Sequence, residues 1–123
     1  REATMREARV CYDHLAGEMG TMMFESMLAR GYLLRADEMI VLTDAGRDFA
    51  RAFLQAEPGG RSRAPLCREC LDWSERRSHL AGQLGRAMLA RMTDLGWARR
   101  LSGSRVIRFS PEGERQFRVL FSG

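Results

Sequence analysis

The tetrapeptide His-Leu-Ala-Gly occurs twice in this chain of 123 residues, at His14–Gly17 and at His79–Gly82, and these copies hold its only two histidines. When the second copy is aligned on the first at an offset of 65 residues, the agreement continues well beyond the tetrapeptide. The sequence therefore predicts an internal repeat in which each half of the chain is one unit of about 50 residues. The further matched pairs include Met23 with Met88, Met27 with Met92, Gly31 with Gly96, and Tyr32 with Trp97.

Each unit is expected to contain a helix, a β-hairpin and a second helix. Gly31 and Gly96 follow the first helix at the point where a left-handed residue ends it. Two short apolar runs then predict a hairpin, and Thr43 and Ser110 are suited to cap the next helix. Glycines within the first helix predict a close backbone approach or a break between helices. The apolar residues at helical spacing, which predict one buried stripe per unit, are Leu15, Met19, Met22, Met23 and Met27 in the first copy and Leu80, Leu84, Met88, Met92 and Leu95 in the second.

A helix followed by RGYL, a hairpin and LTDAGR resembles the end of a winged helix. The segments Leu15–Gly20 and Leu80–Gly85 fit the first helix and turn of a helix-turn-helix motif. The helix after that turn lacks the apolar residues that would pack inward, since Ser26 and Ala29 stand in their place in the first copy. Two interpretations remain open: the turn is absent and the helix continues, or the fold has drifted away from DNA recognition.

The phrases CYDHLAG and CLDWSERRSHLAG, together with RGYL, LTDAGR and FSPEGE, resemble the carboxyl-terminal region of a subgroup of bacterial ArsR/SmtB-type transcriptional regulators. The resemblance covers nearly the whole chain. It implies that a separate amino-terminal winged helix binds operator DNA and that this chain, which would begin just after it, is an effector-sensing or dimerisation region. It further implies a cytoplasmic homodimer that responds to a metal or small-molecule effector. Cys67 lies outside these phrases.

On this basis we expect an α+β fold of two tandem winged-helix-like repeats that pack as one domain through their methionine-rich stripes. A segment rich in proline, glycine and serine separates the repeats and has no periodicity. We expect the first repeat at residues 1–57, the linker at 58–66 and the second repeat at 67–123. The tryptophans Trp73 and Trp97 are expected to be packing anchors.

The three cysteines suggest a metal site. Cys11 and His14 are three residues apart in an expected helix and would share a face, while Cys67 and Cys70 form a C-x-x-C motif. Three thiols and one imidazole suit zinc, and three thiols alone suit trivalent arsenic. The alternatives are a redox dithiol or plain packing of small apolar side chains, with each histidine bonding an equivalent turn of its repeat. The reserve ligands are His79, Asp13 and Asp72.

Charge is divided unevenly along the chain. Residues 1–60 hold 7 arginines against 10 acidic residues, a net charge of −3, whereas residues 61–123 hold 13 against 6, a net charge of +7. The positive charge of the second half would attract phosphate groups. The alternative function is therefore a winged-helix module that contacts nucleic acid through its basic second half. The residues expected to make these contacts are Arg99, Arg100, Arg105 and Arg108.

The sequence points away from two other classes of protein. No apolar run is long enough to cross a bilayer, so we expect no membrane partner. We also expect no enzyme, because no nucleophile has a matching base and no phosphate-cradling loop is present.

Overall fold

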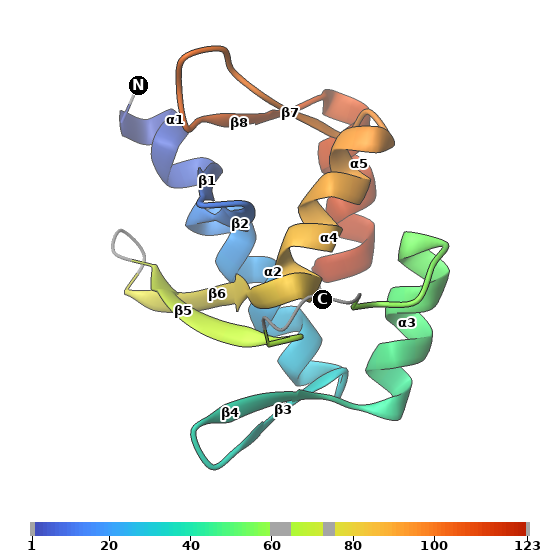
Figure 1. Ribbon diagram of the computed structural model, residues 1–123. Coiled ribbons are helices and arrows are strands. Elements are labelled where there is room, and N and C mark those ends of the chain that lie inside the picture. Colours follow the sequence, from blue (N-terminus) through green and yellow to red (C-terminus); the bar gives the residue numbers. More distant parts are fainter. Residues whose placement is uncertain (1, 60–64, 73–75, 123) are drawn as a thin grey trace.

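The computed structural model describes residues 2–59, 65–72 and 76–122, so most of the expected linker, and also Trp73, lie outside the described residues. These residues form five helices and four two-stranded antiparallel hairpins, which confirms the α+β class (Figure 1). The elements are α1 (Glu2–Glu7), β1 (Arg9–Cys11), β2 (His14–Ala16), α2 (Gly17–Ala29), β3 (Leu33–Ala36), β4 (Met39–Leu42), α3 (Asp44–Leu54), β5 (Arg68–Asp72), β6 (Arg77–Ala81), α4 (Gly82–Asp94), β7 (Ala98–Arg100), β8 (Ile107–Phe109) and α5 (Pro111–Phe121).

After α1, the same order of elements occurs in both halves: hairpin, helix, hairpin, helix. The helices α2 and α4 both span 13 residues and begin 65 residues apart. The sequence interpretation missed the first hairpin of each half. It extended the helical stripe back to Leu15 and Leu80, which in fact lie in β2 and β6, and this part of the prediction was wrong.

The ends of α2 and α4 and the starts of α3 and α5 lie where the sequence predicts them. Gly31 and Gly96 adopt φ values of +75° and +77°, and the residue after each one donates its backbone N–H to a carbonyl in the last turn. Thr43 and Ser110 cap α3 and α5, each accepting a hydrogen bond from a backbone N–H of the first turn. The predicted hairpins between these signals are confirmed as β3–β4 and β7–β8.

Helices α2 and α4 run without interruption, which decides between the two interpretations of the helix-turn-helix pattern. Gly20 and Gly85, where the turn was expected, lie inside these helices. The turn is therefore absent in both halves, and the helix continues.

The two halves pack crosswise. In Figure 1, α2 of the first half lies beside β6 of the second, and α4 correspondingly lies against β2. The first hairpin is also joined to the last, because Val10 N–H donates to the Arg105 carbonyl at 2.8 Å. One core contains the buried methionines of both halves, and Trp97 packs at its edge with its ring 5.5 Å from that of Phe53.

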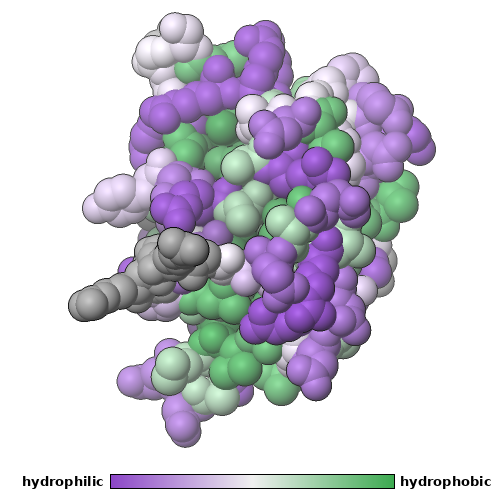
Figure 2. Space-filling view, turned by 45° about the vertical axis from the view of Figure 1, so that its right-hand side comes forward, coloured by the Kyte–Doolittle hydropathy of each residue, from purple (hydrophilic) through white to green (hydrophobic). Residues whose placement is uncertain are grey.

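The outer surface is mixed. Figure 2 shows mostly hydrophilic residues on one face, with apolar atoms reaching the surface in its lower part, where the β3–β4 hairpin lies in Figure 1. The exposed apolar side chains of this hairpin are Leu34, Met39 and Val41. Among the described residues, no helix has the length and apolar character needed to span a bilayer.

Candidate metal centre

The first hairpin of each half carries one cysteine opposite one histidine. In β1–β2 the cross-strand partner of Cys11 is His14, and in β5–β6 the partner of Cys70 is His79. Side chains of directly opposite residues lie on one face of a hairpin with their Cβ atoms about 5 Å apart. The prediction of a helix around Cys11 was wrong, because Cys11 lies in a strand. The predicted proximity of the Cys11 thiol to the His14 imidazole is correct.

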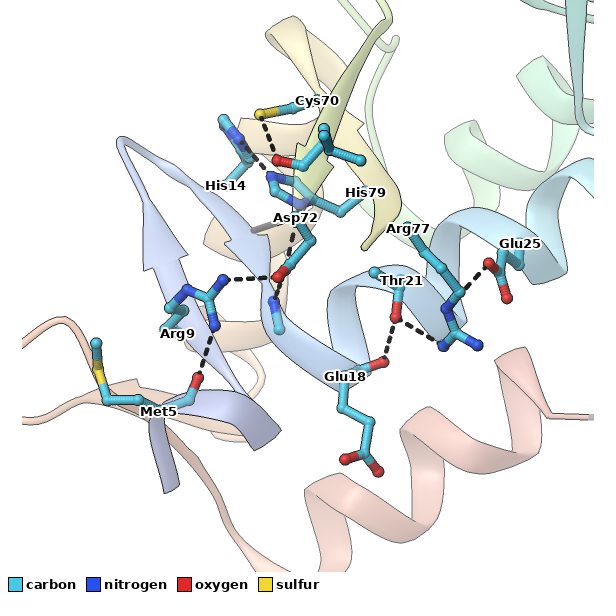
Figure 3. A network of polar contacts seen from close by, with 12 residues as sticks. Met5, Arg9, His14, Glu18, Thr21, Glu25, Cys70, Asp72, Arg77 and His79 are labelled. Atoms are coloured by element: carbon cyan, nitrogen blue, oxygen red, sulfur yellow. Dashed lines mark hydrogen bonds and ion pairs between the residues drawn. The ribbon is translucent and has the colours of Figure 1, made fainter. Parts of the chain in front are cut away.

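The crosswise packing brings these two faces together. The Nε2 atoms of His14 and His79 are 3.1 Å apart, and their ring centroids are 4.9 Å apart (Figure 3). One ligand atom from each of Cys11, His14, Cys70 and His79 lies within 4.8 Å of every other. Both histidines are buried and both cysteines are half-buried. We call these four side chains the Cys2His2 cluster.

A second glycine, three residues after each His-Leu-Ala-Gly tetrapeptide, explains how the two halves approach so closely. A Cβ atom on Gly20 would lie 2.5 Å from the Leu15 carbonyl oxygen and 3.5 Å from the Cβ atom of His79. A Cβ atom on Gly85 would lie 3.3 Å from the Cβ atom of His14. Each helix therefore presses on its own strand and on the histidine of the other half, so the close approach predicted from these glycines is confirmed.

Each histidine has a carboxylate near its Nδ1 atom, while its Nε2 atom faces the other histidine. Asp13 Oδ1 lies 3.5 Å from His14 Nδ1, and Asp72 Oδ2 lies 3.5 Å from His79 Nδ1. Asp72 is buried, pairs with Arg9 at 2.7 Å and accepts the backbone N–H of Gly17 at 2.5 Å (Figure 3). These aspartates, considered as reserve ligands, thus contact the imidazoles from behind.

Burial sets the protonation of the cluster. It lowers the pKa of His14, and together with the neighbouring His14 ring it lowers the pKa of His79 to about 4. Both imidazoles are therefore neutral near pH 7, the form in which a ring nitrogen offers a lone pair. Burial, and next the adjacent Cys11 thiol, raises the pKa of Cys70. The positive charge of Arg68 opposes this shift but does not reverse it, so the thiol keeps its proton near pH 7.

Cys67 does not belong to the cluster. It precedes β5 and is buried in the hydrophobic core, where burial raises the pKa of its thiol to about 11. Cys67 is absent from the group of ligand atoms that lie within 4.8 Å of one another, so Cys67 and Cys70 do not supply a pair of thiols to the cluster. The structure therefore brings Cys11, His14 and Cys70 of the expected set together with the reserve ligand His79, and it places Cys67 apart from them in the core. The three thiols needed for trivalent arsenic are not brought together.

His79 was visible in the sequence only as a reserve ligand. The offset of 65 residues aligns Cys11 with Arg76 and not with Cys70. The reason is that the second hairpin is longer: Cys70 and His79 are nine positions apart, against three for Cys11 and His14, yet both pairs are cross-strand partners. Only the strand pairing shows that each cysteine lies opposite a histidine.

The arginines expected to contact nucleic acid lie in and beside the last hairpin. Arg99 and Arg100 lie in β7, Arg108 lies in β8 and Arg105 lies between the strands; all four are exposed. Arg99 and Arg108 are direct cross-strand partners, an arrangement that brings two positive charges together on one face. Arg100 instead donates to the Ser104 carbonyl at 2.7 Å.

The chain is similar in sequence to a bacterial transcriptional regulator. The chain is 40% identical over 111 residues to YdfF of Bacillus subtilis (strain 168), described as an uncharacterized HTH-type transcriptional regulator. The match covers 89% of this chain but 49% of the relative, so the chain spans about half of that protein. No family model matches the sequence, and no solved structure matches it.

Proposed function

We propose that this chain is the effector-sensing region of an HTH-type transcriptional regulator of the ArsR type, which acts in the bacterial cytoplasm as a homodimer. In this proposal another part of the regulator binds operator DNA, and the present region has no catalytic role. The observation that carries the proposal is the position of the Cys2His2 cluster, which lies where the two halves of the fold meet. The similarity to a described transcriptional regulator supports the same conclusion.

The helices support a sensing role over DNA recognition. A helix-turn-helix protein lays the helix after its turn in the major groove. Here α2 and α4 have no such turn, and their inward faces pack against the hairpins of the opposite half. A group bound between those hairpins would change how the halves fit together. That is the kind of two-state element through which an effector acts on a distant site.

We further propose that residues 1–57 and 67–123 are structural copies joined by the segment 58–66. The equal lengths of α2 and α4, their equivalent caps and their shared order of elements support this. Superposition of residues 14–50 on 79–117 tests the idea. Corresponding helices and hairpins should coincide, and a different relative orientation of helix and hairpin in the two segments would contradict it.

The sensing role is tested on the full-length regulator. Its affinity for operator DNA is measured by fluorescence anisotropy with zinc and with a chelator, for the wild type, for Cys70→Ser and for the matched control Cys67→Ala. We expect zinc to change operator affinity by between about 5-fold and 150-fold in the wild type and the control, the usual range of allosteric coupling, and not in Cys70→Ser. If wild-type affinity is the same with and without zinc, the cluster does not sense zinc for this regulator.

One observation favours a second function, phosphate binding by the last hairpin. The like charges of Arg99 and Arg108 oppose each other across β7–β8, and a phosphate between them would relieve their repulsion. If this hairpin contacts DNA, Arg108→Gln should reduce the salt dependence of DNA binding by about one unit of slope, whatever the DNA sequence. An unchanged slope would exclude the contact.

A further inference from the structure

We infer that the Cys2His2 cluster is a binding site for one zinc ion, held by the Sγ atoms of Cys11 and Cys70 and by the Nε2 atoms of His14 and His79. The ion would bridge the β1–β2 hairpin of the first half and the β5–β6 hairpin of the second. As a statement about regulation this inference rests on the proposed function. As a statement about metal binding it stands alone, and the two can fail separately.

The distances within the cluster are close to those of a tetrahedral site. Zinc binds histidine nitrogen at about 2.0–2.1 Å and thiolate sulfur at about 2.3 Å, so tetrahedral geometry puts two nitrogens about 3.3 Å apart and two sulfurs about 3.8 Å apart. The two Nε2 atoms are 3.1 Å apart, and no two of the four ligand atoms are separated by more than 4.8 Å. Shifts of about an ångström, within reach of side-chain rotation, would complete the shell.

The hydrogen bonds of the two imidazoles also point to an ion. A neutral imidazole carries one proton, so an Nε2–H···Nε2 bond between the rings leaves one of the two Nδ1 atoms bare and facing a carboxylate. His79 Nδ1 is in fact the buried side-chain nitrogen or oxygen without a hydrogen-bond partner among the described residues. With zinc on both Nε2 atoms, both Nδ1 atoms carry protons. They can then donate to Asp13 and Asp72, which is the usual arrangement of carboxylate, histidine and zinc.

An additional proton between the two Nε2 atoms would also give all four imidazole nitrogens a partner. It would, however, leave the two buried rings with a positive charge. The burial of both histidines disfavours that charge. Zinc avoids the problem, because Cys11 and Cys70 each release a proton on binding, and the two thiolates neutralise the ion. The buried complex, counting its four ligands, then has no net charge.

The set of donor atoms selects the class of ion. Two sulfurs and two imidazole nitrogens in a tetrahedral arrangement suit zinc, whereas magnesium and calcium require oxygen ligands. All four positions come from the protein, as in structural zinc sites. The half-buried thiols leave a path by which the ion can enter.

The test uses the full chain, reduced and freed of metal with a chelator, and titrates it with cobalt(II) as a spectroscopic substitute for zinc. The wild type should bind one cobalt per chain and develop the visible bands of a tetrahedral ion together with charge-transfer bands from two thiolates. Zinc should then displace the cobalt. Absence of stoichiometric binding in protein whose thiols are shown to be free would overturn the inference.

Matched variants identify the ligands. Cys70→Ser should weaken cobalt binding by more than about 100-fold, because losing a residue that only supports a ligand already weakens metal binding by up to about that factor. It should also remove half of the charge-transfer intensity at saturation. Cys67→Ala should bind as the wild type does. Asp13→Ala, an exposed change behind His14, should weaken binding by about 10-fold.

Two outcomes contradict the assigned ligands: equal weakening by Cys67→Ala and Cys70→Ser, or no weakening by Cys70→Ser. Circular dichroism of each metal-free variant is the check that the fold is retained. If one zinc binds as described but operator affinity does not respond to it, the sensing proposal fails and this inference stands. If operator affinity responds to zinc in protein whose cluster variants still bind cobalt normally, this inference fails.

Discussion

Asp72→Asn is the substitution that most directly probes how the two halves are held together. Asp72 comes from β5 of the second half, yet its carboxylate pairs at 2.7 Å with Arg9 of β1 and accepts the backbone N–H of Gly17 at the start of α2. The side chains of Arg9 and Asp72 are 2% and 0% exposed, so neither charge is screened by water. Asparagine keeps the shape and an oxygen that can accept the Gly17 N–H, and it removes the charge.

The expected cost follows from this burial. Removing one partner of a buried ion pair typically lowers the free energy of unfolding by about 3–5 kcal/mol, because the remaining charge stays in a medium that solvates it poorly. Since whole domains are stable by about 5–15 kcal/mol, the change removes a large share of the total. Arg9→Met keeps the apolar stem of the arginine and removes its charge. In the double variant neither charge remains, so much of the cost should be recovered.

Urea unfolding of the four proteins, all with a chelator present, measures the coupling of Arg9 and Asp72 as a double-mutant cycle. We expect Asp72→Asn to lose about 3 kcal/mol or more and the pair to be strongly coupled. Additive effects within about 0.5 kcal/mol would show that the two charges do not interact and would refute this reasoning.

Three further predictions concern the helices and their ends, and all are measured by urea unfolding without metal. Gly20→Ala should lower stability by about 2 kcal/mol, because the new Cβ would lie 2.5 Å from the Leu15 carbonyl oxygen and this clash outweighs the roughly 1 kcal/mol gained in helix propensity; a more stable variant would contradict the packing. Gly31→Ala, whose Cβ meets no atom within 4 Å, should lose only about 1 kcal/mol through its positive φ. Thr43→Ala and Ser110→Ala should each lose about 1 kcal/mol through the missing caps of α3 and α5, and no loss in either would show that those hydrogen bonds do not form.

Local signals were sufficient for much of the fold. A glycine in the left-handed region, an N-cap hydroxyl and alternating apolar runs act over a few residues, and each predicted its element correctly. The first hairpin of each half gives a weaker signal. The residues of β2, His14–Ala16, are all buried, so the strand shows no alternation, and Leu15 falls in helical register with Met19 and Met23.

The site was harder to predict because it depends on contacts between the halves. The sequence predicts the proximity of Cys11 and His14 correctly, but it places them in a helix, whereas they lie opposite each other in a hairpin. The C-x-x-C spacing predicts that Cys67 and Cys70 act together, but Cys67 precedes β5 and is buried in the hydrophobic core, apart from the four clustered side chains. That His79 meets His14 is set by crosswise packing, which no spacing within one half determines.

X-ray absorption spectroscopy at the zinc edge of the loaded protein tests the central claim most directly, because it counts and identifies the atoms bound to the ion. The account predicts two sulfurs at about 2.3 Å and two nitrogens at about 2.0–2.1 Å. A shell with three sulfurs, or one made of oxygen and nitrogen alone, would show that the cysteines and histidines of the two hairpins do not close around one ion.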